Sequence, residues 1–255
     1  MGNEREDTVS SLLEDAKKDA DVVGVFVFGS RGREGFADDR SDYDVAVVVR
    51  DESPRSFGLR WPYKHGAPVE VVTMTLGDFR RHAEPGTESA WARYQYSNVR
   101  LLLDKEGDIA RVLESKRHLP PDARGAVARA AIDGYINSTF RSLRNRLLGL
   151  ETAARLDAAE SVPLLLTAIF ALEGRVRPYN KYLEWELGEH PLAEGAWSAE
   201  RLIPRLNGVL DAVSEDLHAL FRDVERVARE HGLDDVIEGW EPDVAWLRGG
   251  AGYRP

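Results

Sequence analysis

Two aspartates, Asp42 and Asp44, are the residues whose type and spacing most clearly suggest chemistry. They stand two positions apart at the start of the apolar run from Tyr43 to Val49, which predicts a β-strand. Because side chains alternate along a strand, both carboxylates are expected on one face, where their mutual repulsion favours a bound cation or a proton. A hard divalent ion such as Mg²⁺ suits this pair, and a solvated strand end with two ordinary acids is the alternative.

The segment before the aspartates offers donors for an anion. The apolar run Val22 to Phe28 predicts a buried strand, and it ends at Gly29 and Ser30, whose backbone N–H groups and hydroxyl suit a phosphate. Arg33 and Ser41 add further donors in the same connection. A plain turn is the alternative for Gly-Ser alone. The ordered series of strand, Gly-Ser, spacer, Ser-Asp-x-Asp and second strand favours an anion site.

Glu70 is a third carboxylate of interest, because it interrupts the apolar strand predicted over Val69 to Thr75. An acid inside a buried strand costs free energy unless it is paired or binds a ligand. A role as metal ligand would offset this cost, and the carboxylate would also suit acceptance of a hydroxyl proton. The alternative is an edge strand with Glu70 facing water. In the preceding loop, Trp61 and Tyr63 suit either stacking on a base or sugar, or local packing.

These motifs resemble a known family. The segment GSRGREGFADDRSDYDVAVVV, followed by VEVV, resembles the nucleotidyltransferase signature of the DNA polymerase β superfamily over roughly residues 22 to 75. A small catalytic domain followed by a helical bundle is similar to the bacterial aminoglycoside nucleotidyltransferases. The helical half resembles them mainly at LLLTAIFALEGRVRPYNKYLEWEL, where Lys181 matches a phosphate-binding lysine of similar enzymes; an ordinary helix lysine is the alternative. Tyr43 replaces a small or aliphatic residue and is expected to face away from the carboxylates.

The resemblance implies a reaction. ATP or another nucleoside triphosphate would bind with two Mg²⁺ ions and transfer a nucleoside monophosphate to a hydroxyl of a small acceptor, releasing pyrophosphate. Asp42, Asp44 and Glu70 are implied as the catalytic and metal-binding residues. The residues implied to bind the nucleotide are Gly29, Ser30, Arg33, Ser41 and Lys181. AMP is the expected group, and an aminoglycoside-type antibiotic is the best single guess for the acceptor, which implies a role in antibiotic resistance.

A polyamine acceptor would need an acidic cleft. The carboxylates available for one are Glu84, Glu88, Glu173, Glu184 and Glu186. Glu184 and Glu186 stand two apart on a presumed helix and cannot share one face well. Two other functions stay open: a toxin–antitoxin nucleotidyltransferase that modifies a protein or tRNA, and a nucleotide-binding regulatory module without catalysis. A homodimer also stays open, because the active site of some relatives lies between two subunits.

The elements that position these residues predict an α+β fold. A small nucleotidyltransferase domain, with a mixed sheet flanked by helices, is expected over residues 1–105, and an all-α helical-bundle domain that binds the substrate over 106–255. In the first domain, a helix over Thr8 to Asp21, with Thr8 as its cap, precedes the three strands, and Val99 to Leu103 adds an edge strand.

Helical periodicity dominates the rest of the chain. The expected helices cover Ala123 to Leu156 (one helix or two nearly continuous ones), Val162 to Glu173, Pro178 to about Gly188, Ala199 to Val213, and Glu215 to His231. The aromatic, Gly-rich tail from Trp240 to Pro255 is expected to pack loosely.

Composition limits the function classes. The formal net charge of −10 does not favour a chain that coats nucleic acid, because the phosphates repel it. The absence of cysteine excludes disulfides, thiolate metal sites and cysteine nucleophiles. No apolar run reaches transmembrane length, and the start MGNEREDTVS lacks the apolar core of a signal peptide. The sequence therefore predicts a cytoplasmic protein without a membrane partner.

Overall fold

The structure is a computed structural model that describes residues 2–52 and 56–250. The chain divides into two compact units, Met1–His118 and Leu119–Pro255. The predicted domain boundary after residue 105 would assign helix α4 (Asp108–Arg117) to the second domain. In the structure, buried side chains of α4, including Ile109 and Val112, pack in a cluster with Phe26 of the sheet, so α4 is part of the first unit.

The first unit contains a four-stranded mixed sheet. Its strands are β1 (Val22–Phe28), β2 (Tyr43–Val49), β3 (Val69–Thr75) and β4 (Arg100–Asp104), in the spatial order β3-β2-β1-β4. The β1 strand pairs antiparallel with both β2 and β4, whereas β2 and β3 are parallel. The bounds of the first three strands are those predicted, β4 is an edge strand as expected, and the α+β fold class is confirmed.

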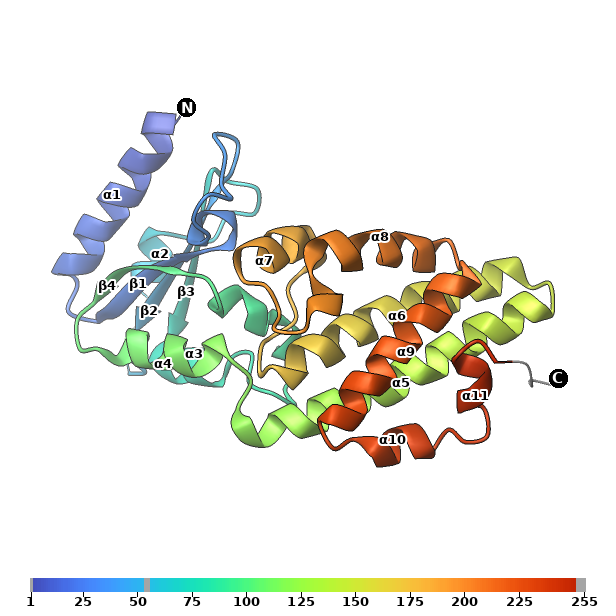
Figure 1. Cartoon of the computed structure of the whole chain (residues 1–255). Coiled ribbons are helices and arrows are strands. Elements are labelled where there is room, and N and C mark those ends of the chain that lie inside the picture. The colour runs from blue at the N-terminus through green and yellow to red at the C-terminus, as the bar shows by residue number, and fades with distance from the viewer. Residues whose placement is uncertain (1, 53–55, 251–255) are drawn as a thin grey trace. The chain divides into compact units, whose positions relative to one another are not determined.

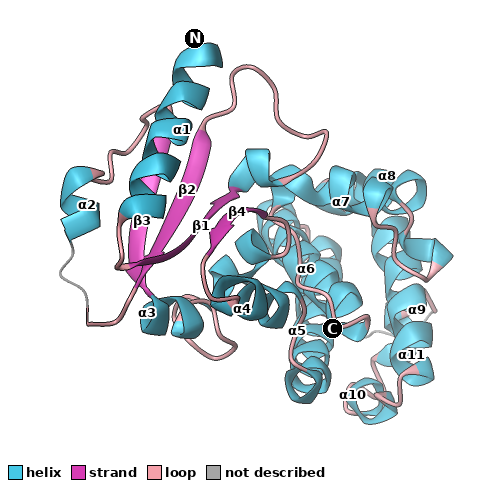
Figure 2. Cartoon of the chain, turned by 90° about the vertical axis from the view of Figure 1, so that its left-hand side faces the viewer, coloured by secondary structure: helices cyan, strands magenta, loops and turns pink. Residues whose placement is uncertain are grey.

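Helices cover both faces of this sheet. Helix α1 (Gly2–Lys18) runs across one face, where its buried Leu12 and Ala16 pack against alternate strand residues such as Val45 (Figure 2). On the other face lie α3 (Leu76–Arg81), the 3-10 helix η2 (Ala90–Tyr96) and α4. A short helix, α2 (Ser56–Arg60), precedes β3. Alternation thus gives each strand one set of side chains for each layer.

Helix α1 begins earlier than predicted. Because α1 already starts at Gly2, Thr8 lies inside the helix, where its hydroxyl donates to the backbone carbonyl of Glu4 at 2.8 Å. The prediction that Thr8 caps the helix is therefore wrong. A threonine inside a helix commonly bonds back to the preceding turn in this way.

The second unit is helical throughout its ordered elements (Figure 1). Its helices are α5 (Pro121–Leu147), α6 (Glu151–Leu172), α7 (Leu183–Glu189), α8 (Ala199–Leu210), α9 (Ser214–Glu230), α10 (Asp234–Glu238) and α11 (Val244–Leu247), with 3-10 helices η3 (Asn180–Tyr182) and η4 (Gly195–Trp197). Of the two alternatives predicted over 123–156, the structure has two nearly continuous helices, which are separated at Gly149, whose φ of +72° is left-handed. Helix α6 then continues through Pro163, so the break predicted between residues 156 and 162 is absent.

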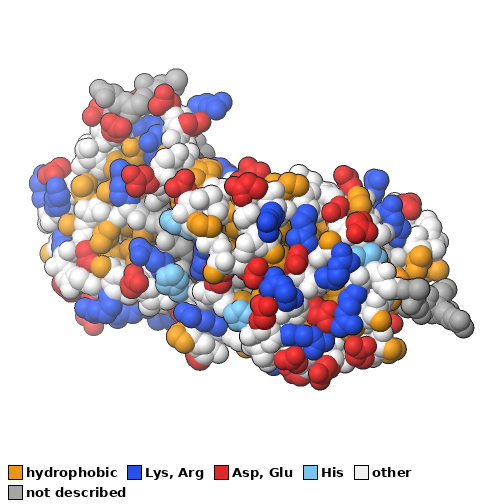
Figure 3. Space-filling model, viewed as in Figure 1, with side chains coloured by type: hydrophobic (Ala, Val, Ile, Leu, Met, Phe, Trp, Pro, Cys, Tyr) orange, Lys and Arg blue, Asp and Glu red, His pale blue; other side chains and the backbone are white. Residues whose placement is uncertain are grey.

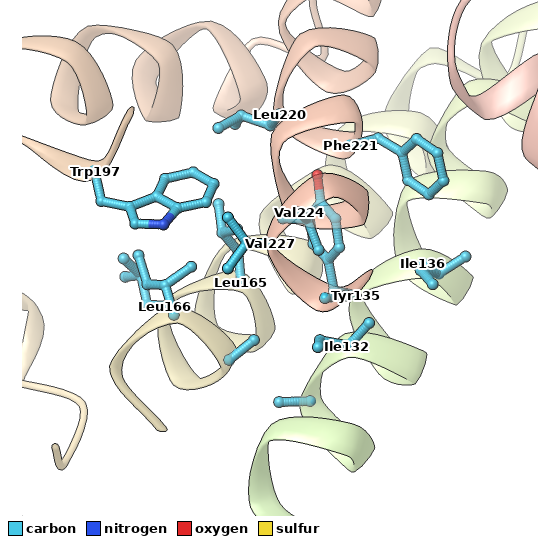
Figure 4. Packing of buried hydrophobic residues seen from close by; sticks show 14 of the residues in the cluster. Ile132, Tyr135, Ile136, Leu165, Leu166, Trp197, Leu220, Phe221, Val224 and Val227 are labelled. Atoms are coloured by element: carbon cyan, nitrogen blue, oxygen red, sulfur yellow. The ribbon is translucent and has the colours of Figure 1, made fainter. Parts of the chain in front are cut away.

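Large apolar side chains fill the core of this unit. Tyr135 of α5, Leu165 of α6, Trp197 of η4 and Phe221 of α9 point into one shared cluster (Figure 4). On the face drawn in Figure 3, acidic and basic side chains of this unit are intermixed rather than gathered by sign. None of the helices in the described part of the chain is both long and apolar enough to cross a membrane.

The C-terminal segment packs more closely than predicted. The indole N–H of Trp240 donates to Asp133 Oδ1 at 2.9 Å, and both Val244 and Leu247 of α11 are fully buried. The expectation of loose packing is therefore wrong up to Leu247. The last part of the predicted tail, residues 251–255, lies outside the described residues.

Candidate active site

Strand register brings two of the predicted carboxylates together. Asp44 of β2 lies directly opposite Glu70 of the parallel strand β3, and opposite Phe28 of the antiparallel strand β1. Residues paired in this way project from the same face of a sheet, with neighbouring strands about 4.8 Å apart. Phe28, Asp44 and Glu70 therefore form one row across three strands, with the two carboxylates side by side.

Gly29 borders this row. Its φ is +66°, a left-handed conformation that favours glycine, and it starts the 3-10 helix η1 (Gly29–Gly32) directly after β1. A Cβ at this position would lie 2.0 Å from the Asp44 Oδ2 atom. Glycine is thus needed for two reasons: the turn itself and the space that the Asp44 carboxylate occupies. The next residue, Ser30, is buried.

A short loop surrounds the Glu70 carboxylate. The backbone N–H of Gly66 donates to Glu70 Oε1, and His65 Nδ1 lies 3.6 Å from the same oxygen. Burial, the negative charge of Glu70, a hydrogen bond to Glu70 and the charge of Asp44 raise the pKa of Tyr63. The edge position of β3 agrees with the alternative reading of Glu70, but the side chain is only 15 % exposed, because the loop covers it.

His65 and Gly66 were missed in the sequence, and no motif there marks them. Tyr63 was considered for stacking on a base or sugar, whereas the structure places it beside Glu70. Trp61 packs locally, since its indole N–H donates to Asp15 Oδ2 of α1 at 3.1 Å. The sequence does not indicate which face of the sheet an aromatic residue in a loop will pack against.

Arg31 holds the loop that leads into β2. Its guanidinium stacks 4.2 Å from the centre of the Tyr43 ring, and its Nε donates to the Ser41 carbonyl at 3.0 Å. Tyr43 is buried in the cluster under α1, so the prediction that it faces away from the carboxylates is confirmed. The Ser41 hydroxyl bonds to Asp38 Oδ1 at 3.2 Å, which makes it part of a turn.

Arg33 contacts the backbone of the Gly29 turn. Its side chain is buried, its Nη1 donates to the carbonyl oxygen of Gly29, and its guanidinium lies 4.7 Å from the centre of the Tyr94 ring. These contacts give Arg33 a role in positioning Gly29. Its predicted contact with nucleotide phosphates stays a prediction.

The remaining predicted residues lie outside the row of Phe28, Asp44 and Glu70 or in the other unit. Asp42 is exposed and precedes β2 by one residue. Lys181 lies in η3 of the second unit, with its Nζ 5.4 Å from the centre of the Tyr182 ring. Within residues 2–52 and 56–250, no three His, Asp or Glu side chains are grouped closely enough to hold a metal ion.

A comparison with known families covers most of the first unit. Residues 9–131 match the family model of the nucleotidyltransferase domain, a stretch that includes the whole sheet together with Gly29, Asp44 and Glu70. Residues 9–131 therefore form a nucleotidyltransferase domain, and the resemblance of this part of the sequence to the nucleotidyltransferase signature is confirmed. Such a domain supports nucleotidyl transfer as the function, with a nucleoside triphosphate as substrate and a divalent metal as the family's usual cofactor.

Among solved structures, a nucleotidyltransferase-like protein from Exiguobacterium sibiricum 255-15 is similar, at 14 % identity and a TM-score of 0.39. The match covers 96 % of this chain and 88 % of that one. No curated protein matches the sequence.

Proposed function

We propose that this protein transfers a nucleoside monophosphate, AMP from ATP in the first instance, to a hydroxyl group of a small acceptor. The observation that carries the proposal is the pairing of Asp44 with Glu70 beside the Gly29 turn, within a nucleotidyltransferase domain. Two hard carboxylates on one sheet face next to a left-handed glycine turn suit a polyphosphate with its cation.

In the proposed reaction, the acceptor hydroxyl attacks the α-phosphorus of the nucleotide. A new P–O bond forms to the acceptor, the bond between the α-phosphorus and the bridging oxygen breaks, and pyrophosphate leaves. Glu70 receives the hydroxyl proton, because its carboxylate adjoins Asp44 on the same face. Gly29 and Ser30 face the departing phosphates, and Arg33 keeps the Gly29 turn in place.

The donor set fits Mg²⁺. Asp44 and Glu70 supply two adjacent carboxylates, which Mg²⁺ takes together with phosphate oxygens, and Asp42 stays a predicted third ligand. Bound there, Mg²⁺ would neutralise negative charge on the transferred group. The Gly66 N–H that bonds to Glu70 orients one oxygen of that carboxylate and leaves the second one for the ion.

An aminoglycoside-type antibiotic is the acceptor class that the family resemblance proposes, together with a role in resistance. Of the five carboxylates predicted to be available for an acidic cleft, three form hydrogen bonds or ion pairs within their own units. Glu84 bonds to Lys116 at 2.7 Å, Glu173 accepts from the Ala193 N–H at 2.7 Å, and Glu186 bonds to Arg175 at 2.6 Å. Aminoglycosides therefore enter a wider acceptor panel.

The test is mass spectrometry of acceptors after incubation with each of four nucleoside triphosphates and Mg²⁺. The panel holds aminoglycosides, lincosamides and a small-metabolite extract. Wild-type protein is compared with Asp44→Asn and with the matched control Asp7→Asn, an exposed acid on α1 across the sheet. An adduct that disappears in Asp44→Asn and persists in Asp7→Asn supports the proposal.

Two other results would favour a different function. Label found only on a protein or RNA from lysate would favour a toxin–antitoxin nucleotidyltransferase. Nucleotide binding without transfer to any acceptor would favour a regulatory module. Equal adduct formation by wild type and Asp44→Asn would contradict the assigned site.

A further inference from the structure

An apolar cavity lies beside the carboxylate row. It has a volume of about 210 Å³ and belongs entirely to the first unit. Its floor comes from three strands: Phe26 and Phe28 of β1, Ala46 of β2, and Val72 and Met74 of β3. Phe28 pairs with Asp44, which makes it common to the cavity and the carboxylate row.

The strand register defines successive rows of residues on this sheet face, from the Gly29 turn to the cavity. Phe28, Asp44 and Glu70 form the first row. Two residues along each strand, a distance of roughly 7 Å, the next row is formed by Phe26, Ala46 and Val72, which pair across the strands in the same way. The carboxylate row therefore lies between the Gly29 turn and the cavity.

The cavity suits an uncharged ligand. Its roof is formed by η2, which contributes Trp91, Ala92, Gln95 and Tyr96, together with His82. Among the described residues that line it, none is Asp, Glu, Lys or Arg. Burial and the nearby charge of Lys116 lower the pKa of His82, so its ring is neutral at pH 7.

The polar atoms of the lining are largely satisfied. The Tyr96 hydroxyl and His82 Nδ1 are 2.7 Å apart and bond to each other, which leaves mainly ring faces and methyl groups for a ligand. Trp91 is 75 % exposed, which is a large apolar area for a surface side chain. It stands at the rim, where its indole can close over a bound ring.

Volume limits what can enter. An engineered apolar cavity of about 150 Å³ holds benzene, and drug-sized ligands occupy about 300–1,000 Å³. A cavity of about 210 Å³ therefore holds one substituted ring. It is too small and too apolar for a polyamine of several sugar rings.

We infer that this cavity binds a single apolar or aromatic ring of the acceptor, whose hydroxyl is then presented to the Asp44–Glu70 pair. The inference rests on the proposed function. In an in-line transfer, the attacking and leaving oxygens lie on opposite sides of the phosphorus. With the departing phosphates at the Gly29 turn, the attacking hydroxyl comes from the other side of the carboxylate row, which is the side of the cavity.

The chemistry of the transfer is unchanged. The ring stays in the cavity, the hydroxyl oxygen forms the bond to the α-phosphorus, the proton passes to Glu70, and pyrophosphate leaves. The acceptor class is thereby narrowed to small alcohols or phenols that carry one uncharged ring.

The test uses the full chain and 4-fluorobenzyl alcohol as the probe. Fluorine NMR measures probe binding without nucleotide, calorimetry measures ATP binding, and mass spectrometry measures the AMP adduct of the probe with ATP and Mg²⁺. The variants are Val72→Trp, which fills the cavity, and Trp91→Ala, which removes its rim. Leu59→Ala, at an 84 % exposed position on α2, is the matched surface control and is expected to keep wild-type activity.

We expect probe binding at least about tenfold weaker in Val72→Trp and Trp91→Ala, with ATP binding retained and adduct formation reduced in parallel. Trp91→Ala keeps the test valid if Val72→Trp fails to fold, because Trp91 is mostly exposed. Wild-type probe affinity in both variants would overturn the inference. Loss of ATP binding together with probe binding would also overturn it, by assigning the cavity to the nucleobase.

Failure of the proposed function gives a different result. Adduct formation equal in wild type and Asp44→Asn would contradict the catalytic assignment, whatever the probe does. Adducts that depend on Asp44 but are insensitive to Val72→Trp would leave nucleotidyl transfer intact and overturn the acceptor cavity alone.

Discussion

In the second unit, buried carboxylates lie against arginines. Asp157 bonds to Arg141 at 2.6 Å, and Glu225 accepts from Arg229 at 3.0 Å and from Arg248. In the first unit, Glu70 instead accepts from a backbone amide beside an exposed histidine, and Asp44 fits against the hydrogen atoms of a glycine.

The surroundings of a carboxylate decide what it can do. An arginine partner neutralises a buried carboxylate and satisfies its oxygens, which stabilises the fold and leaves little affinity for a further cation. Two carboxylates side by side repel each other, which favours a cation bound between them. The Asp44–Glu70 pair is of this second kind and suits a metal–phosphate ligand.

The substitution Gly29→Ala is expected to have the largest effect on this comparison. The new Cβ would lie 2.0 Å from Asp44 Oδ2, so the carboxylate must move away from its place beside Glu70. A displacement of about 1 Å at a catalytic group can lower the rate by about 100-fold, and we expect a loss of that size in kcat/KM for adduct formation.

Gly35→Ala is the matched control. Its φ of +73° carries the same left-handed strain in the same loop, but a Cβ there meets nothing within 4 Å. Equal losses of activity in the two variants would show that backbone strain, rather than the Asp44 contact, causes the effect.

Glu225→Gln tests whether a buried carboxylate paired with arginines stabilises the fold. The variant removes the charge that Arg229 and Arg248 share in a largely buried position, and we expect the free energy of unfolding to fall by about 2 kcal/mol. Urea denaturation measures this change. Glu230, an exposed acid paired with Arg226 on the same helix, provides the control. Glu230→Gln should lower the free energy of unfolding by less than about 0.5 kcal/mol.

The stabilisation by Glu225 is expected to depend on pH. The hydrogen bond from Arg248, together with Arg229, lowers the pKa of Glu225 below its ordinary value of 4.5. Its contribution is therefore full above pH 4.5 and is lost as the pH falls through the lowered pKa of the folded state. The difference in unfolding free energy between wild type and Glu225→Gln should be constant from pH 8 to 5 and shrink below 4.5. An increase on acidification would contradict this assignment.

Tyr63→Phe should have the smallest effect. It removes the hydroxyl that bonds to His65 Nδ1 beside Glu70 but leaves the Gly66 amide that orients the Glu70 carboxylate. We expect kcat/KM for adduct formation to fall less than about fivefold, equivalent to about 1 kcal/mol. A loss as large as that of Gly29→Ala would make Tyr63 a principal part of the site.

Local pattern was sufficient to predict the strands of the first unit. Apolar β-branched runs bounded by Gly and charged residues gave β1, β2 and β3 their bounds, and the predicted carboxylates followed from where those runs begin. The family resemblance implies that Asp44 and Glu70 share a site, but local pattern alone does not predict their pairing, because parallel register depends on how two distant strands align.

Tertiary packing decided the features that the sequence missed. Helix α4 belongs to the first unit because Ile109 and Val112 pack on the sheet. The periodicity of these residues predicts a helix but does not predict which unit the helix packs against. The segment around α11 is rich in Gly and aromatic residues, yet its Val244 and Leu247 side chains are buried in the core of the second unit. The loop around Glu70 gave no motif, since a backbone amide carries no residue signature.

The central claim is that the Asp44–Glu70 pair serves chemistry, whereas Glu225 with its two arginines serves stability. The most direct measurement compares Asp44→Asn and Glu225→Gln in two assays: nucleotide adduct formation at 25 °C and the free energy of unfolding. We predict that Asp44→Asn loses adduct formation at least about 100-fold with near wild-type stability, and that Glu225→Gln loses stability with near wild-type activity. Retained activity in Asp44→Asn, or lost activity in folded Glu225→Gln, would contradict the account.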